Sequence, residues 1–167
     1  MTRIGLLSDT HGWLDQAIFK HFAEVNEIWH AGDWGNNEML DELMAFKPVR
    51  AVFGNIDDNH LRNRLPEKNC FRCEDVQVAM LHIAGYPGKY NSQAKALIKE
   101  CRPQLFVTGH SHILKILYDH NLQHLHINPG AAGQQGWHQQ RTLVRFSIDG
   151  KEIKDCEIIE LGRRGSQ

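Results

Sequence analysis

The sequence predicts an α/β fold, in which short buried strands alternate with amphipathic helices. Apolar runs at 4–7, 28–31 and 49–53 are too short for helices and are typical of strands that are buried on both faces. Apolar residues with helical spacing over about 14–25 and around 39–44 predict a helix between each pair of these strands. This alternation favours parallel strands joined by right-handed crossovers.

The second half of the chain changes character after an irregular stretch at about 61–66. Strands are expected at 69–73 and 76–83, then a helix from Ser92 to about Cys101. Buried or half-buried strands are predicted to follow at 105–108, 113–118, 123–128, 141–148 and 152–160, with Asp149-Gly150 as a hairpin signal. Because no repeat or linker interrupts this pattern, we expect one domain over residues 1–167.

The composition is that of an ordinary globular protein, with 167 residues, 41% hydrophobic and 23% charged. A formal net charge of -1 gives no basic field, which argues against nucleic acid as a partner. No apolar run approaches the ~20 residues of a membrane helix, and the apolar N-terminal stretch is too short for a signal peptide. We therefore expect a cytoplasmic protein with no membrane partner, and we leave a homo-oligomer open.

The four cysteines are expected to be free thiols in a reducing cytosol. Cys70 and Cys73 have the C-x-x-C spacing, but no second pair with matching spacing completes a structural zinc site. A thioredoxin-like redox motif would begin a helix, whereas this pair lies on a predicted strand. Cys101 and Cys156 have no sequence signal of pairing.

Polar side chains lie near or directly after the ends of five predicted strands. They are Asp9, His11, Asp33, Asn55, His82, His110 and His112. Sites in α/β sheets assemble at the carboxyl ends of strands, and i,i+2 pairs on extended backbone share a face, so we expect the seven to converge. The glycines before Asp33, Asn55 and His110 are expected to provide positive φ in tight turns.

This donor set suits Mn²⁺, Fe, Zn²⁺, Co²⁺ or Ni²⁺ better than Ca²⁺ or Cu(I). Seven donors are too many for one tetrahedral ion, so they predict two divalent ions that share a carboxylate. Taken singly, each residue has a plainer explanation, because an Asp after a strand commonly caps a helix and a lone His commonly lies in the core or on the surface. Only the ordered combination predicts metal binding.

Several nearby residues keep more than one interpretation. Trp13 either walls the pocket or packs on the first helix, and His30 either supports the site or belongs to the core. Asp57 either orients Asn55 or a water, or forms a turn. No chemistry is assigned to the 130–138 loop, which is expected to be a flexible rim, or to the hairpin histidines His120, His124 and His126, which are expected at exposed positions.

The series Asp9-x-His11, Gly32-Asp33, Gly54-Asn55, His82 and Gly109-His110-Ser111-His112 resembles the calcineurin-like metallophosphoesterase superfamily. Short length, Gly54-Asn55-Ile56-Asp57 and Ile127-Asn128-Pro129-Gly130 make the chain similar to the small YfcE-type phosphodiesterase branch. The resemblance implies the metallophosphoesterase fold, a four-layer α/β/β/α sandwich of two mixed β-sheets flanked by helices. It assigns Asp9, His11, Asp33 and His112 to one metal, and Asp33, Asn55, His82 and His110 to the other, with manganese as the expected metal.

The resemblance implies a phosphoesterase, foremost a phosphodiesterase, that acts on a small phosphate ester. Hydroxide between the two metals would attack in line, with Asp33, Asn55 and His82 acting through the metals. Many members carry a proton-donating His where this chain has Ile56, and this departure favours diesters or good leaving groups over alkyl monoesters. A phosphomonoesterase and a non-catalytic scaffold, such as the retromer subunit of this superfamily, are the alternatives. A nuclease is disfavoured by the neutral charge.

Overall fold

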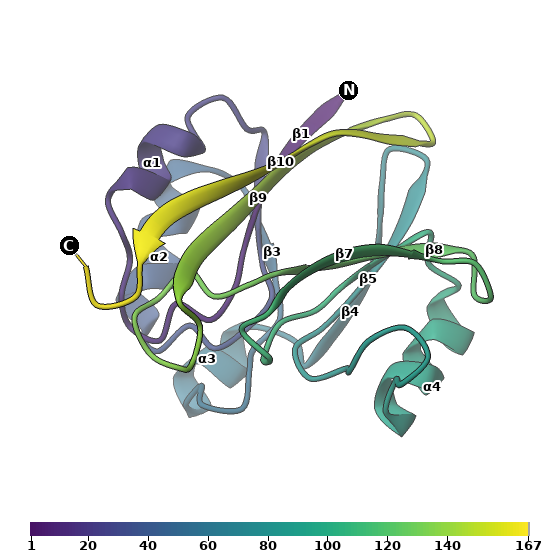
Figure 1. Ribbon diagram of the computed structural model, residues 1–167, viewed down its shortest axis with the longest axis horizontal. Helices are drawn as coiled ribbons and strands as arrows, with labels where there is room; N and C mark the ends of the chain where they lie inside the picture. Colours follow the sequence, from purple (N-terminus) through teal and green to yellow (C-terminus); the bar gives the residue numbers. More distant parts are fainter. Residues whose placement is uncertain (167) are drawn as a thin grey trace.

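Two five-stranded β-sheets pack face to face in the computed structural model, which describes residues 1–166 (Figure 1). The first sheet has the order β10-β9-β1-β2-β3 and the second the order β4-β5-β6-β8-β7. The first comprises β1 (Thr2–Leu7), β2 (Glu27–His30), β3 (Val49–Ala51), β9 (Gln140–Asp149) and β10 (Glu152–Arg163). The second comprises β4 (Lys68–Cys73), β5 (Val76–Leu81), β6 (Leu105–Val107), β7 (Leu114–Asp119) and β8 (His124–Pro129).

Helices cover the outer face of each sheet and complete the four layers. They are α1 (Ala17–His21), α2 (Asn37–Phe46), α3 (Asn59–Arg64) and α4 (Ser92–Cys101). In Figure 1, α1 and α2 lie on the side of the first sheet and α4 lies on the side of the second. Ile18 and Leu40 pack with Leu7 of β1, whereas Leu97 packs with Phe106 of β6. The expected α/β/β/α sandwich is therefore confirmed.

Both sheets are mixed, as expected. Strands β1, β2 and β3 are parallel, and β9 runs antiparallel to β1. In the second sheet β5, β6 and β8 are parallel, and the edge strands β4 and β7 are antiparallel to their neighbours. Along β1, Ile4 and Leu6 face the core between the sheets while Leu7 faces the helices, so the strand is buried on both faces.

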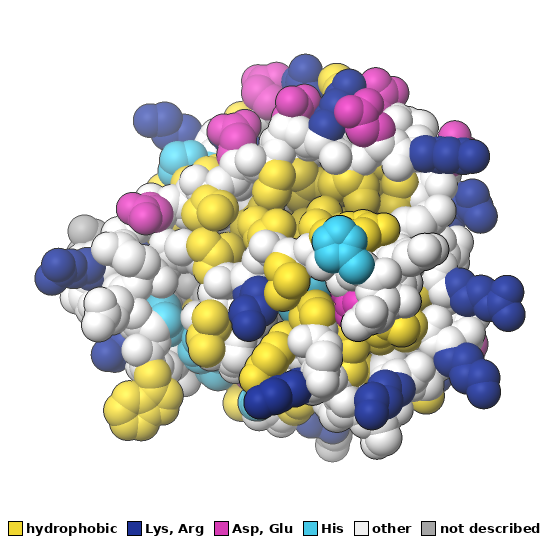
Figure 2. All heavy atoms as spheres, turned by 45° about the vertical axis from the view of Figure 1, so that its right-hand side comes forward, with side chains coloured by type: hydrophobic (Ala, Val, Ile, Leu, Met, Phe, Trp, Pro, Cys, Tyr) yellow, Lys and Arg dark blue, Asp and Glu magenta, His cyan; other side chains and the backbone are white. Residues whose placement is uncertain are grey.

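Partly buried hydrophobic side chains surround the core between the two sheets. The partly buried side chains of Phe71, Ile116 and Ile153 lie at the margin of this core. In Figure 2, hydrophobic side chains fill a hollow whose upper rim carries intermixed acidic and basic groups.

Within residues 1–166, no helix is long and apolar enough to cross a membrane.

Two helical boundaries differ from the prediction. The helix expected over about 14–25 is α-helical only at Ala17–His21, although Phe22 and Val25 are buried as its pattern requires. The stretch expected to be irregular contains α3, whose N-terminus is capped by Asp58 through a 3.1 Å bond from the Leu61 N–H. Because Leu61 is the buried residue of this short polar helix, there was no apolar periodicity to detect.

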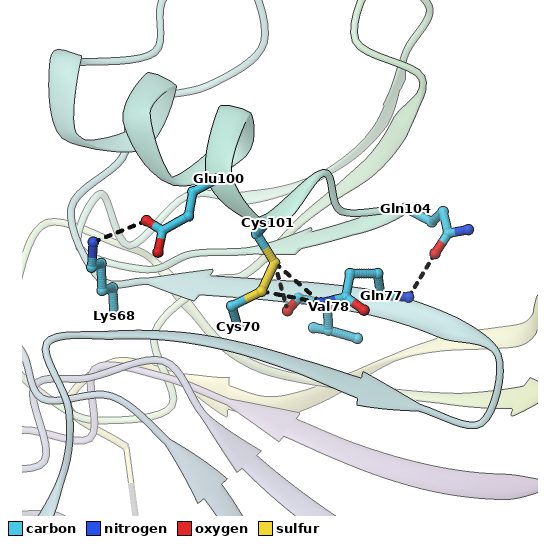
Figure 3. Close-up of a disulfide and its surroundings, with 7 residues drawn as sticks. All are labelled: Lys68, Cys70, Gln77, Val78, Glu100, Cys101 and Gln104. Carbon is cyan, nitrogen blue, oxygen red and sulfur yellow. Dashed lines mark hydrogen bonds and ion pairs between the residues drawn. A yellow bond between two sulfur atoms is a disulfide. The ribbon is translucent and has the colours of Figure 1, made fainter.

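The expectation of four free thiols is wrong, because Cys70 of β4 is disulfide-bonded to Cys101 at the end of α4 (Figure 3). The two residues are separated by 31 positions in the sequence, and their Cα atoms lie 5.9 Å apart. Their pairing results from the packing of α4 over the second sheet, which the C-x-x-C spacing does not report. Cys73 and Cys156 are free.

Replacing both Cys70 and Cys101 by serine is expected to lower the free energy of unfolding by about 3–4 kcal/mol, because the cross-link restricts the unfolded chain over a long loop. Urea denaturation of the double variant and the native protein measures this difference, and Cys156→Ser serves as the control for loss of an exposed thiol. Turnover should change little, since the disulfide contacts none of the site residues. Equal stability of the double variant and the native protein would contradict the assignment of this cross-link.

Candidate metal centre

The seven predicted site residues are supplied by loops that follow strands of both sheets. Asp9 follows β1 and Asp33 follows β2, and these parallel strands run in register up to the Leu7–His30 pair. The pairing continues past the strands, where the Asp9 N–H donates to the Gly32 carbonyl over 3.0 Å. His82 and His110 belong to the second sheet's loops, which follow β5 and β6. The site therefore lies at the seam between the sheets.

The structure brings the predicted residues together in two adjacent groups. Asp9, His11 and His112 form the first metal group, and Asp33, His82 and His110 form the second, with candidate donor atoms within 4.8 Å of one another in each. Asp33 Oδ2 lies 3.3 Å from His11 Nε2 and 3.2 Å from His82 Nε2, between the two groups. Asn55 Oδ1 lies 3.1 Å from His110 Nδ1, at the edge of the second group.

Hydrogen bonds to one oxygen of each aspartate fix the orientation of its carboxylate. Asp9 Oδ2 accepts hydrogen bonds from Ser8 Oγ at 2.6 Å and from the His110 N–H at 3.0 Å. Asp33 Oδ1 accepts a bond from the Ile56 N–H at 3.1 Å. The other oxygens face the imidazoles, and Asp9 Oδ1 lies 3.1 Å from His112 Nε2. The protein thus holds each carboxylate in place while it leaves one oxygen directed into the cluster.

The donor set fits two divalent cations because its inward atoms are buried without hydrogen-bond partners. Asp9 Oδ1, His11 Nε2 and His82 Nε2 are all in this state within residues 1–166. His82 Nδ1 lies 2.7 Å from the Ala31 carbonyl, so this nitrogen carries the proton and the lone pair of Nε2 faces the cluster. Buried unsatisfied donors and acceptors cost about 1–3 kcal/mol each, which coordination of a cation removes.

The charges of the cluster are strongly coupled. Burial raises the pKa of Asp9, but the neighbouring imidazoles of His11 and His112 outweigh this effect and hold the pKa well below its usual range. Burial also raises the pKa of Asp33, and His11 and His82 hold this pKa below its usual range in the same way. In turn, Asp33 and then Asp9 raise the pKa of His11 to about 9. Such a cluster favours positive charge at its centre, which divalent cations supply in place of protons.

The backbone of the candidate ligands is mostly left-handed. The residues with positive φ are Asp9 (55°), His11 (46°), Asp33 (59°), His110 (71°) and His112 (62°). Of the three glycines expected to have positive φ, Gly32 does, at 104°. The expectation is wrong for Gly54 and Gly109, where a Cβ would instead collide with the Asp33 carboxylate or with Ser8 Oγ. These two positions need glycine for close approach of the loops.

Asp57 and His30 support the site through backbone groups. The Asp57 carboxylate accepts bonds from the N–H groups of Asp33, Gly35 and Gly54 at 2.8–3.0 Å, which favours the turn interpretation. His30 is fully buried, and this burial lowers its pKa to about 3. It accepts from the Gly32 N–H and lies 3.0 Å from Thr10 Oγ1, so it buttresses the loops that carry the two aspartates.

Three residues that hold the site were given no role from the sequence, although Asn128 belongs to the motif at 127–130 that supports the family resemblance. Arg62 of α3 donates to the carbonyls of Asp57 and Asn55, at 2.7 and 3.2 Å, and so fixes the loop that presents Asn55. Asn128 donates to the Gly109 carbonyl at 3.0 Å, beside the His110 loop. His138 Nδ1 lies 3.3 Å from His112 Nδ1, so the 130–138 loop reaches the first metal group.

The expectation of exposed hairpin histidines is wrong for His124 and His126. Both are buried on β8, where the Tyr90 hydroxyl lies 2.9 Å from His124 Nε2 and 2.7 Å from His126 Nδ1. Their alternation was predicted correctly, but Tyr90, in the segment before α4, covers this face of the strand. Only His120 of the three is exposed.

Comparisons with known proteins agree with this geometry. Residues 2–151 match the family model described as the calcineurin-like phosphoesterase superfamily domain. A protein of Methanothermobacter thermautotrophicus named "Probable metallophosphoesterase" is 32% identical, over 95% of this chain and 92% of its own length.

Solved structures share the fold at lower identity. A structure described as a novel archaeal phosphodiesterase has a TM-score of 0.75 at 21% identity, covering 95% of this chain and 99% of that one. Vps29 of Entamoeba histolytica complexed with Zn²⁺ has a TM-score of 0.73 at 16% identity, with 95% and 98% covered. The family match and the curated relative together show that the chain belongs to the calcineurin-like phosphoesterase superfamily.

Proposed function

We propose that this chain is a metal-dependent phosphodiesterase that hydrolyses small phosphate esters with two divalent ions, manganese being the expected metal. The observation that carries the proposal is the position of Asp33 Oδ2, within 3.3 Å of one imidazole from each metal group. A carboxylate placed in this way suits a pair of ions that share it. Two candidate groups, each with buried inward donors, are consistent with such a dinuclear site.

The residues have distinct tasks in this proposal. Asp9, His11 and His112 would hold one ion, Asn55, His82 and His110 would hold the other, and Asp33 would serve both. When bound, two divalent ions supply positive charge to a phosphoryl group and lower the pKa of a water molecule towards ~7. Burial of both aspartates excludes bulk water and strengthens their electrostatic interactions. Because the aspartates are positioned by backbone and serine donors, little reorganisation is needed when a substrate binds.

Diester hydrolysis is favoured over alkyl monoester hydrolysis by the residue at position 56. Ile56 is 45% exposed and contributes its backbone N–H to Asp33, but its side chain cannot donate a proton. Similarity in fold to the archaeal phosphodiesterase supports the same assignment. A scaffold role is the competing proposal, since Vps29 shares the fold, but the complete donor set of this chain favours catalysis.

Metal content and chelation test the proposal. The Mn²⁺-saturated protein is expected to contain two ions per chain by elemental analysis, and to hydrolyse bis(p-nitrophenyl) phosphate. A chelator should abolish this activity, and Mn²⁺, Co²⁺ or Ni²⁺ should restore it. His110→Ala should lose one ion, whereas the matched variant of an exposed histidine, His120→Ala, should retain both. One ion or fewer in the saturated native protein, or hydrolysis that resists the chelator, would contradict the two-metal site.

A further inference from the structure

A cavity of about 500 Å³ opens beside the second metal group and includes His110 of that group among its lining residues. We call it the apolar cavity. Its walls come from the loops that follow β5 and β6, from the beginning of β7 and from β8. The volume lies within the range of about 300–1,000 Å³ that is typical of small-molecule sites. A molecule held at the second metal group therefore has room to extend into it.

A second cavity of similar volume shows that size alone does not single out a site. It measures about 510 Å³ and is lined by residues such as Arg3, Arg145 and Cys156, and it shares no residue with either metal group. The apolar cavity differs because it borders the candidate chemistry. Its position makes it a place for the organic part of a phosphate ester.

The walls of the apolar cavity carry three large hydrophobic side chains that are well exposed. Ile83, Tyr86 and Ile113 are 38, 40 and 61% exposed, and all three line it. Exposed hydrophobic side chains gathered in a concavity, rather than scattered singly, mark a surface that contacts a ligand. An aromatic ring and two isoleucine side chains on the walls of one cavity suit a flat, largely apolar group.

The charge of the apolar cavity excludes cationic groups. Lys115 Nζ lies 4.2 Å from the centroid of the Tyr86 ring, which places a positive charge on the cavity wall. No carboxylate is found among its lining residues within the described part of the chain. His126 adds no charge at neutral pH, because burial lowers its pKa to about 4. The ligand should therefore be neutral or anionic where it meets this wall.

The polar groups of the floor are already engaged. The Asn128 amide donates to the Gly109 carbonyl and to Ser111 Oγ, each at 3.0 Å. His126 Nδ1 lies 2.7 Å from the Tyr90 hydroxyl. Because these groups are satisfied within the protein, burying an apolar ring against them leaves few groups without a partner.

A smaller cavity shares Ile83 with the apolar cavity. It measures about 170 Å³, and Asn55 and His82 are among its lining residues, together with the polar side chains of Arg62 and Gln93. Phe53 and Leu81 line the smaller cavity as well, and Ile83 lines both, so the second metal group is bordered by one large apolar space and one small space of mixed polarity. Two unequal spaces beside one phosphoryl site match a diester with two unequal ester groups.

We propose that the apolar cavity binds an aromatic ester group, and that the substrates are phosphodiesters with one aryl or nucleoside-type group and one smaller, more polar group. This inference rests on the proposed function, since it requires the phosphoryl group to lie at the metals. Tyr86, Ile83 and Ile113 would contact the ring. They are specificity-determining residues and take no part in bond cleavage.

Binding of two phosphonates tests the inference without turnover, because their C–P bond is not hydrolysed. Calorimetric titration of the Mn²⁺-loaded protein should give a Kd for phenylphosphonate about 10- to 100-fold below that for methylphosphonate, as burial of an aromatic ring predicts. Tyr86→Ala and Ile113→Ala should each reduce this ratio at least threefold. The matched controls Tyr118→Ala on β7 and Ile158→Ala on β10, which remove comparably exposed side chains, should keep it.

The outcomes separate this inference from the proposed function. Equal Kd values for the two phosphonates, or a ratio that both cavity variants leave unchanged, would overturn the apolar cavity as the binding site. Ile113 is well exposed, so its truncation keeps the test available if Tyr86→Ala does not fold. A preserved phenyl preference without metal-dependent hydrolysis of bis(p-nitrophenyl) phosphate would overturn the phosphodiesterase instead.

Discussion

Asp33→Ala is expected to lower metal-dependent hydrolysis of bis(p-nitrophenyl) phosphate by about three orders of magnitude or more, which corresponds to several kcal/mol of lost transition-state stabilisation. The change removes the carboxylate oxygen that lies beside His11 and His82, and with it the group that would hold both ions. The core should stay intact, because Asp33 belongs to neither sheet and lies in the loop after β2.

Two further variants make this measurement specific to the carboxylate. Asp33 has a φ of 59°, a conformation that Asn tolerates better than Ala, so Asp33→Asn removes the charge with less backbone strain. It should also lose most activity and at least one ion. Asp41→Ala removes an exposed aspartate that is paired with Arg64, and this variant should retain its activity and its two ions. Similar kinetics for Asp33→Ala and Asp41→Ala, with both proteins folded by circular dichroism, would show that the site is misplaced.

The rate of diester hydrolysis is expected to depend strongly on the leaving group, because Ile56 offers no proton to a departing alkoxide. General acid catalysis is typically worth about 10²–10⁴-fold, so aryl diesters should be cleaved faster than alkyl diesters of similar size by a factor of this order. A plot of log kcat/KM against leaving-group pKa for a series of diesters measures the effect.

Ile56→His should flatten this plot if the variant keeps both metals, and Ile56→Gln is the control for polarity without proton transfer. A flat plot for the native protein would mean that another acid is present. Asp57 is a poor candidate, since its carboxylate already accepts three backbone hydrogen bonds. His60, exposed on α3, and His138, beside His112, would then be the first residues to replace.

The strands and the clustering of the polar residues could be predicted because both depend on short stretches of sequence. The run at 4–7 is buried on both faces of β1, and it is followed directly by Asp9 and His11. The same local rule, an apolar strand and then a polar residue, located Asp33 and His110. Convergence within each sheet followed from the rule that parallel strands present their carboxyl ends at one edge, whereas the meeting of the two edges depends on how the sheets pack.

Features that depend on how distant segments pack could not be predicted. The Cys70–Cys101 bond requires α4 to lie over the second sheet, and nothing in the spacing of the cysteines reports this. His124 and His126 alternate as exposed residues do, and only Tyr90 from another segment buries them. His138 lies 26 positions from His112, and a loop of glycine and glutamine gives no sign of its course.

The left-handed backbone of the candidate ligands has an evolutionary consequence. Each non-glycine residue in this conformation costs about 1–2 kcal/mol, so the five candidate ligands with positive φ weaken the fold in exchange for the geometry of the candidate site. If a lineage ceased to need hydrolysis, glycine or asparagine at these positions would relieve the cost and leave the sandwich core untouched. Selection for stability alone would therefore erode the metal site first. A protein of this shape drifts more readily from enzyme to inert scaffold than in the opposite direction.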